Sequence, residues 1–392
     1  MNRLSEHTVA DSGTVMEAQA WLCALPLPVP LNLGAISYKT RDYVVLRLTT
    51  SDGYTGHAVG YTRGTPLLEA SKVVCEHLAD LPTAPEAAHT ALRKRLAPGW
   101  GAFARAASLV DIALWDIRAQ RQGRPLAATL GARTADAPLM AVAGYFSDTR
   151  SVDELVEETI RFVEDGYTTL KLILPGHDRR ADLHLLDTMR AAHPDRIAIA
   201  VDFHGAFDSV SDALGYCEDI HRRGVRFIED PFPSLDWHNV ADFASQSPSP
   251  VASGEDLVNL TGFDDLLGAG VQYLRVDVTA SGGYTTALAA LQAAEQRSAR
   301  VAPHVWPHFH APLVAASPSV AMIEVIPDHV GADPLWRLLS EPAPIHAGTW
   351  LTPTEPGLAL PLDMEAVAHH SVDSWSSSAR PAAAPIPTGG VS

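Results

Sequence analysis

The chain has 392 residues, of which 46% are hydrophobic, a length that suits one large domain with a smaller one beside it. Its 29 basic residues against 46 acidic ones give a formal net charge of −17, which argues against nucleic acid as a partner because an acidic surface repels phosphate. The three cysteines, Cys23, Cys75 and Cys217, form no Cys-x-x-Cys pair, which argues against a disulfide framework and a thiolate zinc site.

The first 20 residues carry Glu6, Asp11 and Glu17 and no continuous apolar run, so we expect no signal peptide, no membrane partner and a cytoplasmic location. Strand-like segments at 15–25 and 43–49 then lead to a turn at Asp52-Gly53. A helix is expected over 104–121, ending before Gly123. This mixture predicts an α+β capping domain over residues 1–132.

Residues 133–330 alternate short apolar runs with amphipathic helices. The first of these helices is expected to begin at Ser151, with Glu154 completing a capping box, and to end at Gly166. Eight strands are predicted, at 139–144, 168–174, 197–202, 225–229, 251–253, 273–277, 300–303 and 320–325. Repeated β–α units form a parallel sheet, and eight of them favour closure, so we predict an α/β fold with a (β/α)8 barrel of the TIM type.

The remainder of the chain changes character. Residues 331–373 have mixed patterning and are expected to pack back on the capping domain. Residues 374–392 are rich in Ser, Ala and Pro, which predicts a disordered tail.

Seven predicted strands carry an ionisable side chain at or just after their ends, and these residues are 20 (304 to 324) to 31 (171 to 202) positions apart, about one β–α repeat. They should therefore lie at equivalent strand ends, on the face where barrel enzymes place their active sites. A single acid there is more often a helix N-cap, but seven in register are not explained by capping. The seven are Lys171, Asp202, Glu229, Glu255, Asp277, His304 and Glu324; their neighbours Asp230 and Asp256 are the better N-cap candidates.

The carboxylates of Asp202, Glu229 and Glu255 would form an all-oxygen metal site on adjacent strands. Hard oxygen ligands favour Mg²⁺, with Mn²⁺ as a substitute, and three ligands leave positions open for substrate. A substrate carboxylate that binds such an ion becomes more acidic at its α-carbon. The sequence therefore predicts proton abstraction beside a carboxylate.

The neighbouring strands carrying Asp277 and His304 can form a hydrogen-bonded dyad in which the Asp raises the basicity of the imidazole. Lys171, across the ring, can hold the substrate carboxylate or carry a proton on the opposite face. Glu324 can donate to a carboxylate oxygen if it is protonated, or orient a neighbour.

Three further histidines lie near these positions. His204 follows Asp202 by two residues and therefore lies on the same side of the strand, where an acid or base role and a hydrogen bond to a loop are both open. His308 and His310 come just after the dyad histidine, and contact with the substrate is the less favoured interpretation for both.

Several segments together carry a family resemblance: Ser108 to Asp116 (SLVDIALWD), Gly123-Arg124-Pro125-Leu126, Leu130-Gly131 and Glu355-Pro356-Gly357-Leu358. Over residues 15–365 the chain resembles the mandelate racemase subgroup of the enolase superfamily. The resemblance implies Mg²⁺ on the three carboxylates, His304 with Asp277 as the general base, and Glu324 as the electrophilic acid. It also implies that loops at 25–37 and 57–65, with Tyr61 and Arg63, select the substrate.

One departure from the family pattern narrows the function. The resemblance implies a Lys-x-Lys motif whose second lysine is a base on the opposite face, but here the stretch is Lys171-Leu172-Ile173. Two-sided proton transfer is therefore disfavoured, and we predict a lyase, a sugar-acid dehydratase that yields a 2-keto-3-deoxy acid. The alternatives are a cycloisomerase, a lactone isomerase or an epimerase of a hydroxy acid, or a catalytically silent binding protein on the same scaffold. A homo-oligomer is expected.

Overall fold

The computed structural model describes residue 11 and residues 13–33, 36–131, 136–193 and 197–378. The predicted boundary between residues 132 and 133 lies outside these residues, as do most of the first twelve positions and residues 379–392 of the predicted tail. No helix in the described part is both long enough and apolar enough to cross a bilayer.

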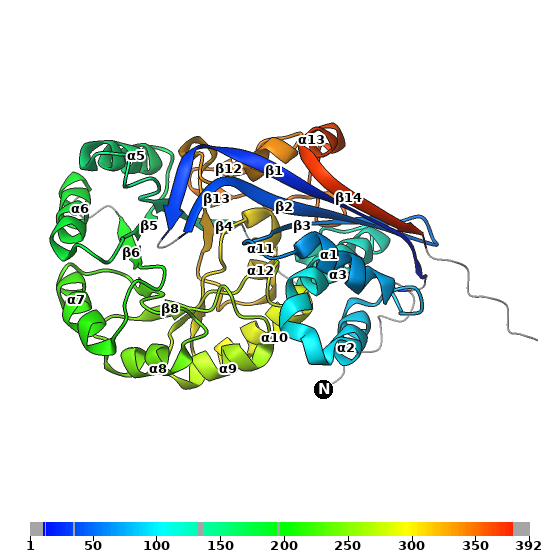
Figure 1. Cartoon of the computed structure of the whole chain (residues 1–392), viewed down its shortest axis with the longest axis horizontal. Coiled ribbons are helices and arrows are strands. Elements are labelled where there is room, and N and C mark those ends of the chain that lie inside the picture. Colours follow the sequence, from blue (N-terminus) through cyan, green and yellow to red (C-terminus); the bar gives the residue numbers. More distant parts are fainter. Residues whose placement is uncertain (1–10, 12, 34–35, 132–135, 194–196, 379–392) are drawn as a thin grey trace, which may run out of the picture.

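The capping domain is a four-stranded antiparallel sheet covered on one side by helices (Figure 1). Helix α3 packs so closely on β3 that a Cβ atom at Gly56 would lie only 2.1 Å from the carbonyl oxygen of Ala113. Only glycine allows this approach. The strand order is β14-β1-β2-β3, with β1 Val15–Leu33, β2 Ile36–Thr50, β3 Thr55–Tyr61 and β14 Ser371–Ser378; the helices are α1 Leu67–Glu76, α2 Pro85–Arg95, α3 Trp100–Arg121 and α4 Leu126–Leu130.

The tail prediction is wrong for residues 374–378, which form the end of strand β14 beside β1. Composition misled the prediction because an edge strand is held by backbone hydrogen bonds, which Ser-rich segments make as well as apolar ones do. Trp375 lies opposite Ala20, and its indole Nε1 donates to the carbonyl of Leu68 at 3.0 Å. Upstream, α13 (Met364–His370) and a 3-10 helix (Pro334–Leu338) also pack against β1.

The predicted (β/α)8 barrel is confirmed. Its strands pair in parallel in the order β4 to β10, and β11 pairs with β4. The ring closes between β10 and β11, where the Val301 amide donates to Ser319 at 2.9 Å and the Ala321 amide donates to Val301 at 2.8 Å.

The units of the barrel are β4 Ala137–Ala143, α5 Val152–Glu164, β5 Thr169–Ile173, α6 Arg179–Ala192, β6 Ala198–Asp202, α7 Val210–Arg222, β7 Ile228–Glu229, α8 Trp237–Gln246, β8 Val251–Ser253, α9 Leu260–Gly268, β9 Tyr273–Leu274, α10 Gly283–Gln296, β10 Arg300–Val301, α11 Pro307–His310, α12 Leu313–Ala316 and β11 Ile323–Val325. The short strands β12 Ile345–His346 and β13 Thr349–Trp350 extend the sheet beside β4. The capping box at α5 is present as predicted, with the Ser151 amide donating to Glu154 at 2.7 Å.

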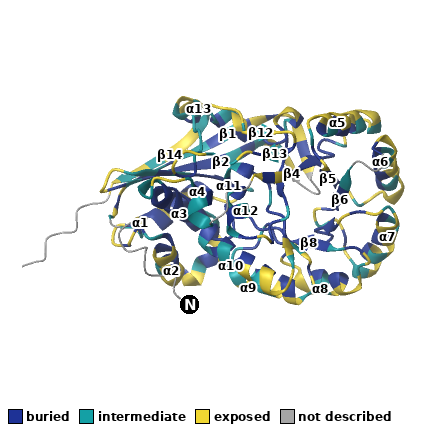
Figure 2. Cartoon of the chain, turned by 180° about the vertical axis from the view of Figure 1, so that it is seen from behind, coloured by how far each residue is buried: buried dark blue, intermediate teal, exposed yellow. Residues whose placement is uncertain are grey.

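The apolar core fills the barrel below the carboxyl ends of the strands, where the polar side chains lie. Buried residues line the strands and the inner faces of the surrounding helices, whose outer faces are exposed (Figure 2). A separate apolar cluster fills part of the barrel interior; it consists of Met140, Ala200, Phe227, Ala252, Ala302 and Met322. Because these side chains contain no hydrogen-bonding groups, the interior polar groups gather at the carboxyl ends of the strands.

Candidate active site

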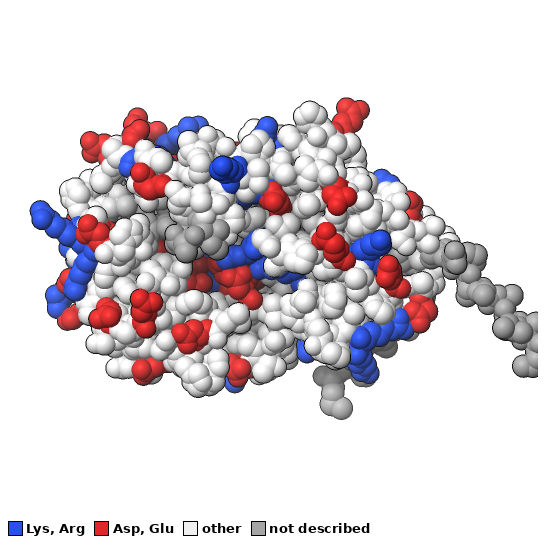
Figure 3. All heavy atoms as spheres, in the orientation of Figure 1, with Lys and Arg blue, Asp and Glu red and all other residues white. Residues whose placement is uncertain are grey.

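Ionisable side chains meet at the carboxyl end of the barrel, where Figure 3 shows acidic residues in a hollow with basic residues beside them. The structure brings together all seven predicted strand-end residues. Lys171 Nζ lies 2.8 Å from Asp202, 3.2 Å from Glu229 and 2.9 Å from Glu324. His304 joins Glu255 and Asp277 at 3.4 Å and 3.0 Å, and Glu255 lies beside Glu229.

The carboxylates that could hold a metal include one that the sequence interpretation assigned elsewhere. Glu229, Asp230 and Glu255 each present an oxygen within 4.8 Å of the other two. Glu229 Oε2 and Asp230 Oδ1 are buried and have no hydrogen-bond partner among the described residues. Unpartnered buried carboxylate oxygens fit a hard divalent cation. Asp202 adjoins this cluster, but its oxygens already contact Lys171 and His204.

The predicted N-cap role of Asp230 is wrong. Helix α8 begins only at Trp237, with Asp236 before it, so Asp230 is separated from the helix by a turn. The backbone of Asp230 has a φ of +37°, a strained left-handed value for a non-glycine residue. This conformation ends the strand and leaves the carboxylate among those of its neighbours.

The cluster carries excess negative charge. Burial, followed by the charges of Glu255 and Glu229, raises the pKa of Asp230 well above its usual range. Burial also raises the pKa of Glu229, against the opposing effects of Arg275 and Lys171. For Glu255 burial acts in the same direction, but His304 and Arg63 outweigh it and hold that pKa well below its usual value. A bound cation would relieve this repulsion.

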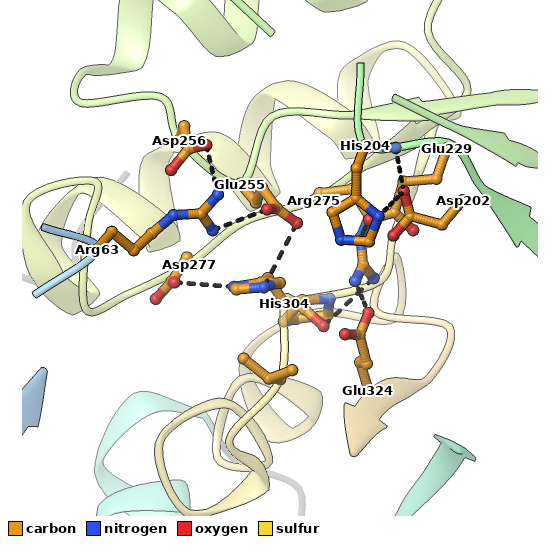
Figure 4. A network of polar contacts seen from close by, with 12 residues as sticks. Arg63, Asp202, His204, Glu229, Glu255, Asp256, Arg275, Asp277, His304 and Glu324 are labelled. Atoms are coloured by element: carbon orange, nitrogen blue, oxygen red, sulfur yellow. Dashed lines mark hydrogen bonds and ion pairs between the residues drawn. The ribbon is translucent and has the colours of Figure 1, made fainter. Parts of the chain in front are cut away.

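His304 and Asp277 form the predicted dyad, in which His304 Nδ1 lies 3.0 Å from Asp277 Oδ2 (Figure 4). The other oxygen of Asp277 accepts from the amide and the hydroxyl of Thr279, both at 2.7 Å. Burial alone would raise the pKa of Asp277. The hydrogen bond with His304 and the charge of that ring outweigh burial, so the pKa falls to about 2. An ionised Asp277 keeps the proton on Nδ1, so Nε2 is the basic atom, and it lies 3.4 Å from Glu255.

The loop that carries the dyad histidine is held by His310. Val305 and Trp306 both have positive φ, +41° and +42°, which only strong tertiary contacts can maintain. His310 supplies two of them, since its Nδ1 donates to Val305 at 2.7 Å and its Nε2 accepts from the Val278 amide at 2.9 Å. Both ring nitrogens are therefore occupied by the backbone.

His308 lies outside the network of strand-end residues. It packs edge-on against Trp350, with ring centroids 4.7 Å apart, and lines a separate cavity of about 240 Å³. Burial lowers the pKa of both His308 and His310 to about 4, so both are neutral near pH 7.

Arg275 is an important residue that the sequence interpretation missed. It is fully buried, its Nε donates to Glu229 at 2.8 Å, and its other nitrogens contact Glu324 and the carbonyl of Ala302. The available signal was its spacing, because a residue two positions before Asp277 in a strand lies on the same face.

Glu324 therefore lies between two cations, Lys171 and Arg275. Burial lowers the pKa of Lys171, but Asp202 and Glu229 outweigh this effect, so the pKa is raised and the ammonium stays charged. These contacts fit a role for Glu324 in orienting its neighbours. Proton donation to a carboxylate oxygen, the other role considered for this residue, stays a prediction.

The capping domain reaches the site through Arg63, which bonds Glu255 at 2.9 Å and Asp256 at 3.0 Å (Figure 4). Asp256 also accepts from Arg105 at 2.8 Å. The N-cap prediction for Asp256 is therefore wrong as well. Asn259 caps helix α9, accepting from the Gly262 amide, and Asp256 bridges the two domains.

His204 and Ile173 flank the carboxylates on the remaining sides. His204 has a φ of +48°, and its Nδ1 lies 3.3 Å from Asp202 Oδ1. Its side chain is 28% exposed, which leaves it open to a ligand. Ile173, at the end of β5, pairs with Asp202 in the sheet and is buried, so an apolar side chain occupies the position of the second lysine.

Comparison with known proteins places both domains. Residues 17–131 match the family described as mandelate racemase/muconate lactonizing enzyme, N-terminal domain, and residues 154–367 match the enolase C-terminal domain-like family. A relative is the L-talarate/galactarate dehydratase of Salmonella typhimurium, 25% identical over 333 residues that cover 81% of this chain and 83% of that one.

Two further relatives are named for different reactions, a cycloisomerisation and a dehydration. The D-galactarolactone cycloisomerase of Agrobacterium fabrum is 24% identical over 280 residues, covering 67% of this chain and 72% of its own. The structure of L-talarate dehydratase from Polaromonas, complexed with Mg and L-glucarate, superposes with a TM-score of 0.84 at 24% identity. The match covers 94% of this chain and all of that one.

Proposed function

This chain belongs to the mandelate racemase/muconate lactonizing enzyme family, and from that premise we propose that it is a magnesium-dependent sugar-acid dehydratase. Both matched domains agree with the resemblance predicted from the sequence, which is confirmed. The single observation that carries the reaction type is one histidine–aspartate dyad beside the carboxylate cluster, with an isoleucine where a second base would lie.

Glu229 and Glu255, with Asp202 or Asp230 as a third ligand, would hold Mg²⁺. The unpartnered oxygens and mutual repulsion of this cluster fit such an ion. When bound, the ion would make the α-proton more acidic and stabilise the charge that develops on the substrate carboxylate. Lys171 is close enough to Asp202 and Glu229 to contact the same carboxylate.

In this proposal His304 Nε2 takes the α-proton, and the C–H electron pair becomes the carbon–carbon double bond of an enediolate. Asp277 holds Nδ1 and stabilises the imidazolium that forms. The β-carbon–oxygen bond then breaks, and the hydroxyl leaves as water with a proton from the imidazolium or from His204. The resulting enol tautomerises to a 2-keto-3-deoxy acid, so the net change is the loss of one water.

One alternative function has a specific observation behind it, the similarity to a cycloisomerase. In such an enzyme the same base acts without loss of the β-hydroxyl. A catalytically silent binding protein is disfavoured, since an intact dyad beside buried unpartnered carboxylates costs stability without serving a purpose.

The test is a screen of aldonic and aldaric acids with Mg²⁺, scored for a 2-keto-3-deoxy acid by its semicarbazone absorbance. Turnover of at least one acid, lost in His304→Asn, is expected. If the α-hydrogen exchanges in D₂O but no keto acid forms, the assignment as a dehydratase is replaced by that of an isomerase. Neither turnover nor exchange with any acid would overturn the proposal.

A further inference from the structure

Arg41, near the start of β2 in the capping sheet, is a buried cation that forms no ion pair with any described residue. Its side chain is 6% exposed, and within the described residues it makes no ion pair and no hydrogen bond; its Nε is buried and unpartnered. Its guanidinium lies over the ring of Tyr61, 5.1 Å from the centroid. An aromatic face only partly replaces an anion, so this position favours a negatively charged ligand.

Arg41 lies on the face of the sheet that covers the barrel mouth. Alternation along β2 puts it on the same side as Tyr43. Tyr43 packs edge-on against Trp306, with centroids 6.4 Å apart, and Trp306 packs edge-on against His304 at 5.7 Å. The strands of the cap reach the barrel here, as Figure 1 shows, and Asn32 of β1 bonds Asp148 in the loop after β4 at 2.5 Å.

Two neighbours define the space around this guanidinium. Tyr145 follows β4 and is buried; burial raises the pKa of its hydroxyl, while the charges of Arg41 and Lys171 oppose that change. Asp333 acts on Arg41 through its charge, which raises the pKa of the guanidinium, but it forms no ion pair with Arg41. Its oxygens are engaged by Tyr43, Trp306 and the Leu335 amide.

The other cations around the site are already neutralised. Lys171 and Arg275 bind Glu229 and Glu324, while Arg63 and Arg105 bind the acids that follow β8. A chain with a formal net charge of −17 repels a dianion unless a free cation is placed for it. Among the described residues at the mouth, Arg41 fits that requirement.

We propose that Arg41 binds a second carboxylate of the substrate, so that the acid turned over is a sugar diacid rather than a sugar monoacid. This inference rests on the proposed dehydratase function and deepens it. The planar guanidinium can bind a carboxylate through two parallel N–H bonds, while the reacting carboxylate lies at the acidic cluster. A monoacid of the same length would leave Arg41 unpaired.

The experiment compares kcat/KM for matched pairs, galactarate with galactonate and glucarate with gluconate, in the wild type and in Arg41→Gln and Arg41→Lys. We expect the wild type to prefer diacids by about 100-fold, because a site built to bond a polar group rejects ligands that lack it. Arg41→Gln should lower the diacid-to-monoacid ratio about 100-fold, and Arg41→Lys, which keeps the charge, should restore part of it.

The matched control is Arg47→Gln on the same strand, whose guanidinium lies over Trp21 at 5.6 Å and bonds Gln19, away from the mouth. It should leave the ratio unchanged. A wild type that prefers monoacids, or an Arg41→Gln variant that loses both substrates equally, would overturn the inference while the dehydratase proposal stands. If no acid is turned over, the proposed function fails first, and thermal stabilisation by diacids that is lost in Arg41→Gln still tests the carboxylate site.

Discussion

The two halves of the site are stabilised in different ways. In one half, Lys171 and Arg275 pair with Glu229 and Glu324, and none of these four side chains is more than 3% exposed. In the other half, which holds the dyad and Glu255, the dyad histidine is 12% exposed, and the arginine that reaches Glu255 from the cap is 29% exposed.

The difference separates two tasks. Paired charges in a dry interior are expensive to bury and costly to break, so the first half holds its carboxylates in a fixed arrangement. The second half keeps its basic nitrogen open to the substrate and in contact with the cap. Catalysis should therefore depend most on the open half and folding most on the closed half.

The largest effect on activity is expected in the open half. His304→Asn removes the base and should lower kcat/KM about 10⁴-fold, the upper range for general base catalysis. Asp277→Asn should lower kcat/KM about 10²-fold, because the imidazole of His304 remains but its preferred tautomer is no longer fixed. Steady-state kinetics on any acid found in the screen measures both. His308→Asn is the control, and a comparable loss there would contradict the assignment of the base.

The largest effect on folding is expected in the closed half. Arg275→Met leaves Glu229 and Glu324 without one of their cations and should lower the free energy of unfolding by about 3–5 kcal/mol. Urea unfolding measures it. Arg297→Gln breaks an exposed pair with Asp264 and should change the same quantity by less than about 1 kcal/mol. Equal effects of the two substitutions would mean that the buried pairs do not hold the barrel mouth.

Magnesium should act where the halves meet. At a hundredfold excess over its Kd, Mg²⁺ should stabilise the wild type by about 2.7 kcal/mol, and Glu229→Gln should lose this gain. Asp230→Asn and Asp202→Asn, compared in the same unfolding assay, identify the third ligand. Glu157→Gln, on an exposed part of α5, should keep the full gain. A gain that survives Glu229→Gln would exclude the cluster as the metal site.

A last effect, on the pH dependence of stability, concerns a buried acid whose one ion-pair contact with the described residues is His89 at 3.9 Å. Burial raises the pKa of Asp111 in α3 to about 8, although the amide and hydroxyl of Thr285 bond its carboxylate. A raised folded-state pKa means that the folded form binds the proton more tightly. Stability is therefore full below the unfolded value near 4 and declines as the pH rises towards about 8.

Between about pH 5 and pH 8 the wild type should lose at least about 1 kcal/mol through this group, since one pKa unit corresponds to about 1.4 kcal/mol. In Asp111→Asn the slope should be flatter. Unfolding curves at several pH values measure the difference, and identical slopes in the two proteins would show that Asp111 is ionised in the folded state.

Much of this arrangement was predictable because strand ends recur at one β–α repeat. That regularity identified the barrel and brought together the seven residues from Lys171 to Glu324. Asp230 was misassigned because its role depends on a positive φ, which sequence patterns do not reveal. Arg275 and Arg41 were missed because a charged residue inside a strand has meaning only when its partners, or their absence, are known.

Strand β14 has a consequence for how the protein is made. Its first residue follows the last residue of its partner β1 by 338 positions (371 − 33), so the cap remains incomplete while the barrel is synthesised. At 5–20 residues per second this delay is roughly 17 to 70 seconds. During this delay the edge of β1 is unpaired and can pair with other nascent chains. The barrel, which is complete earlier in the sequence, can fold before β14 closes the cap.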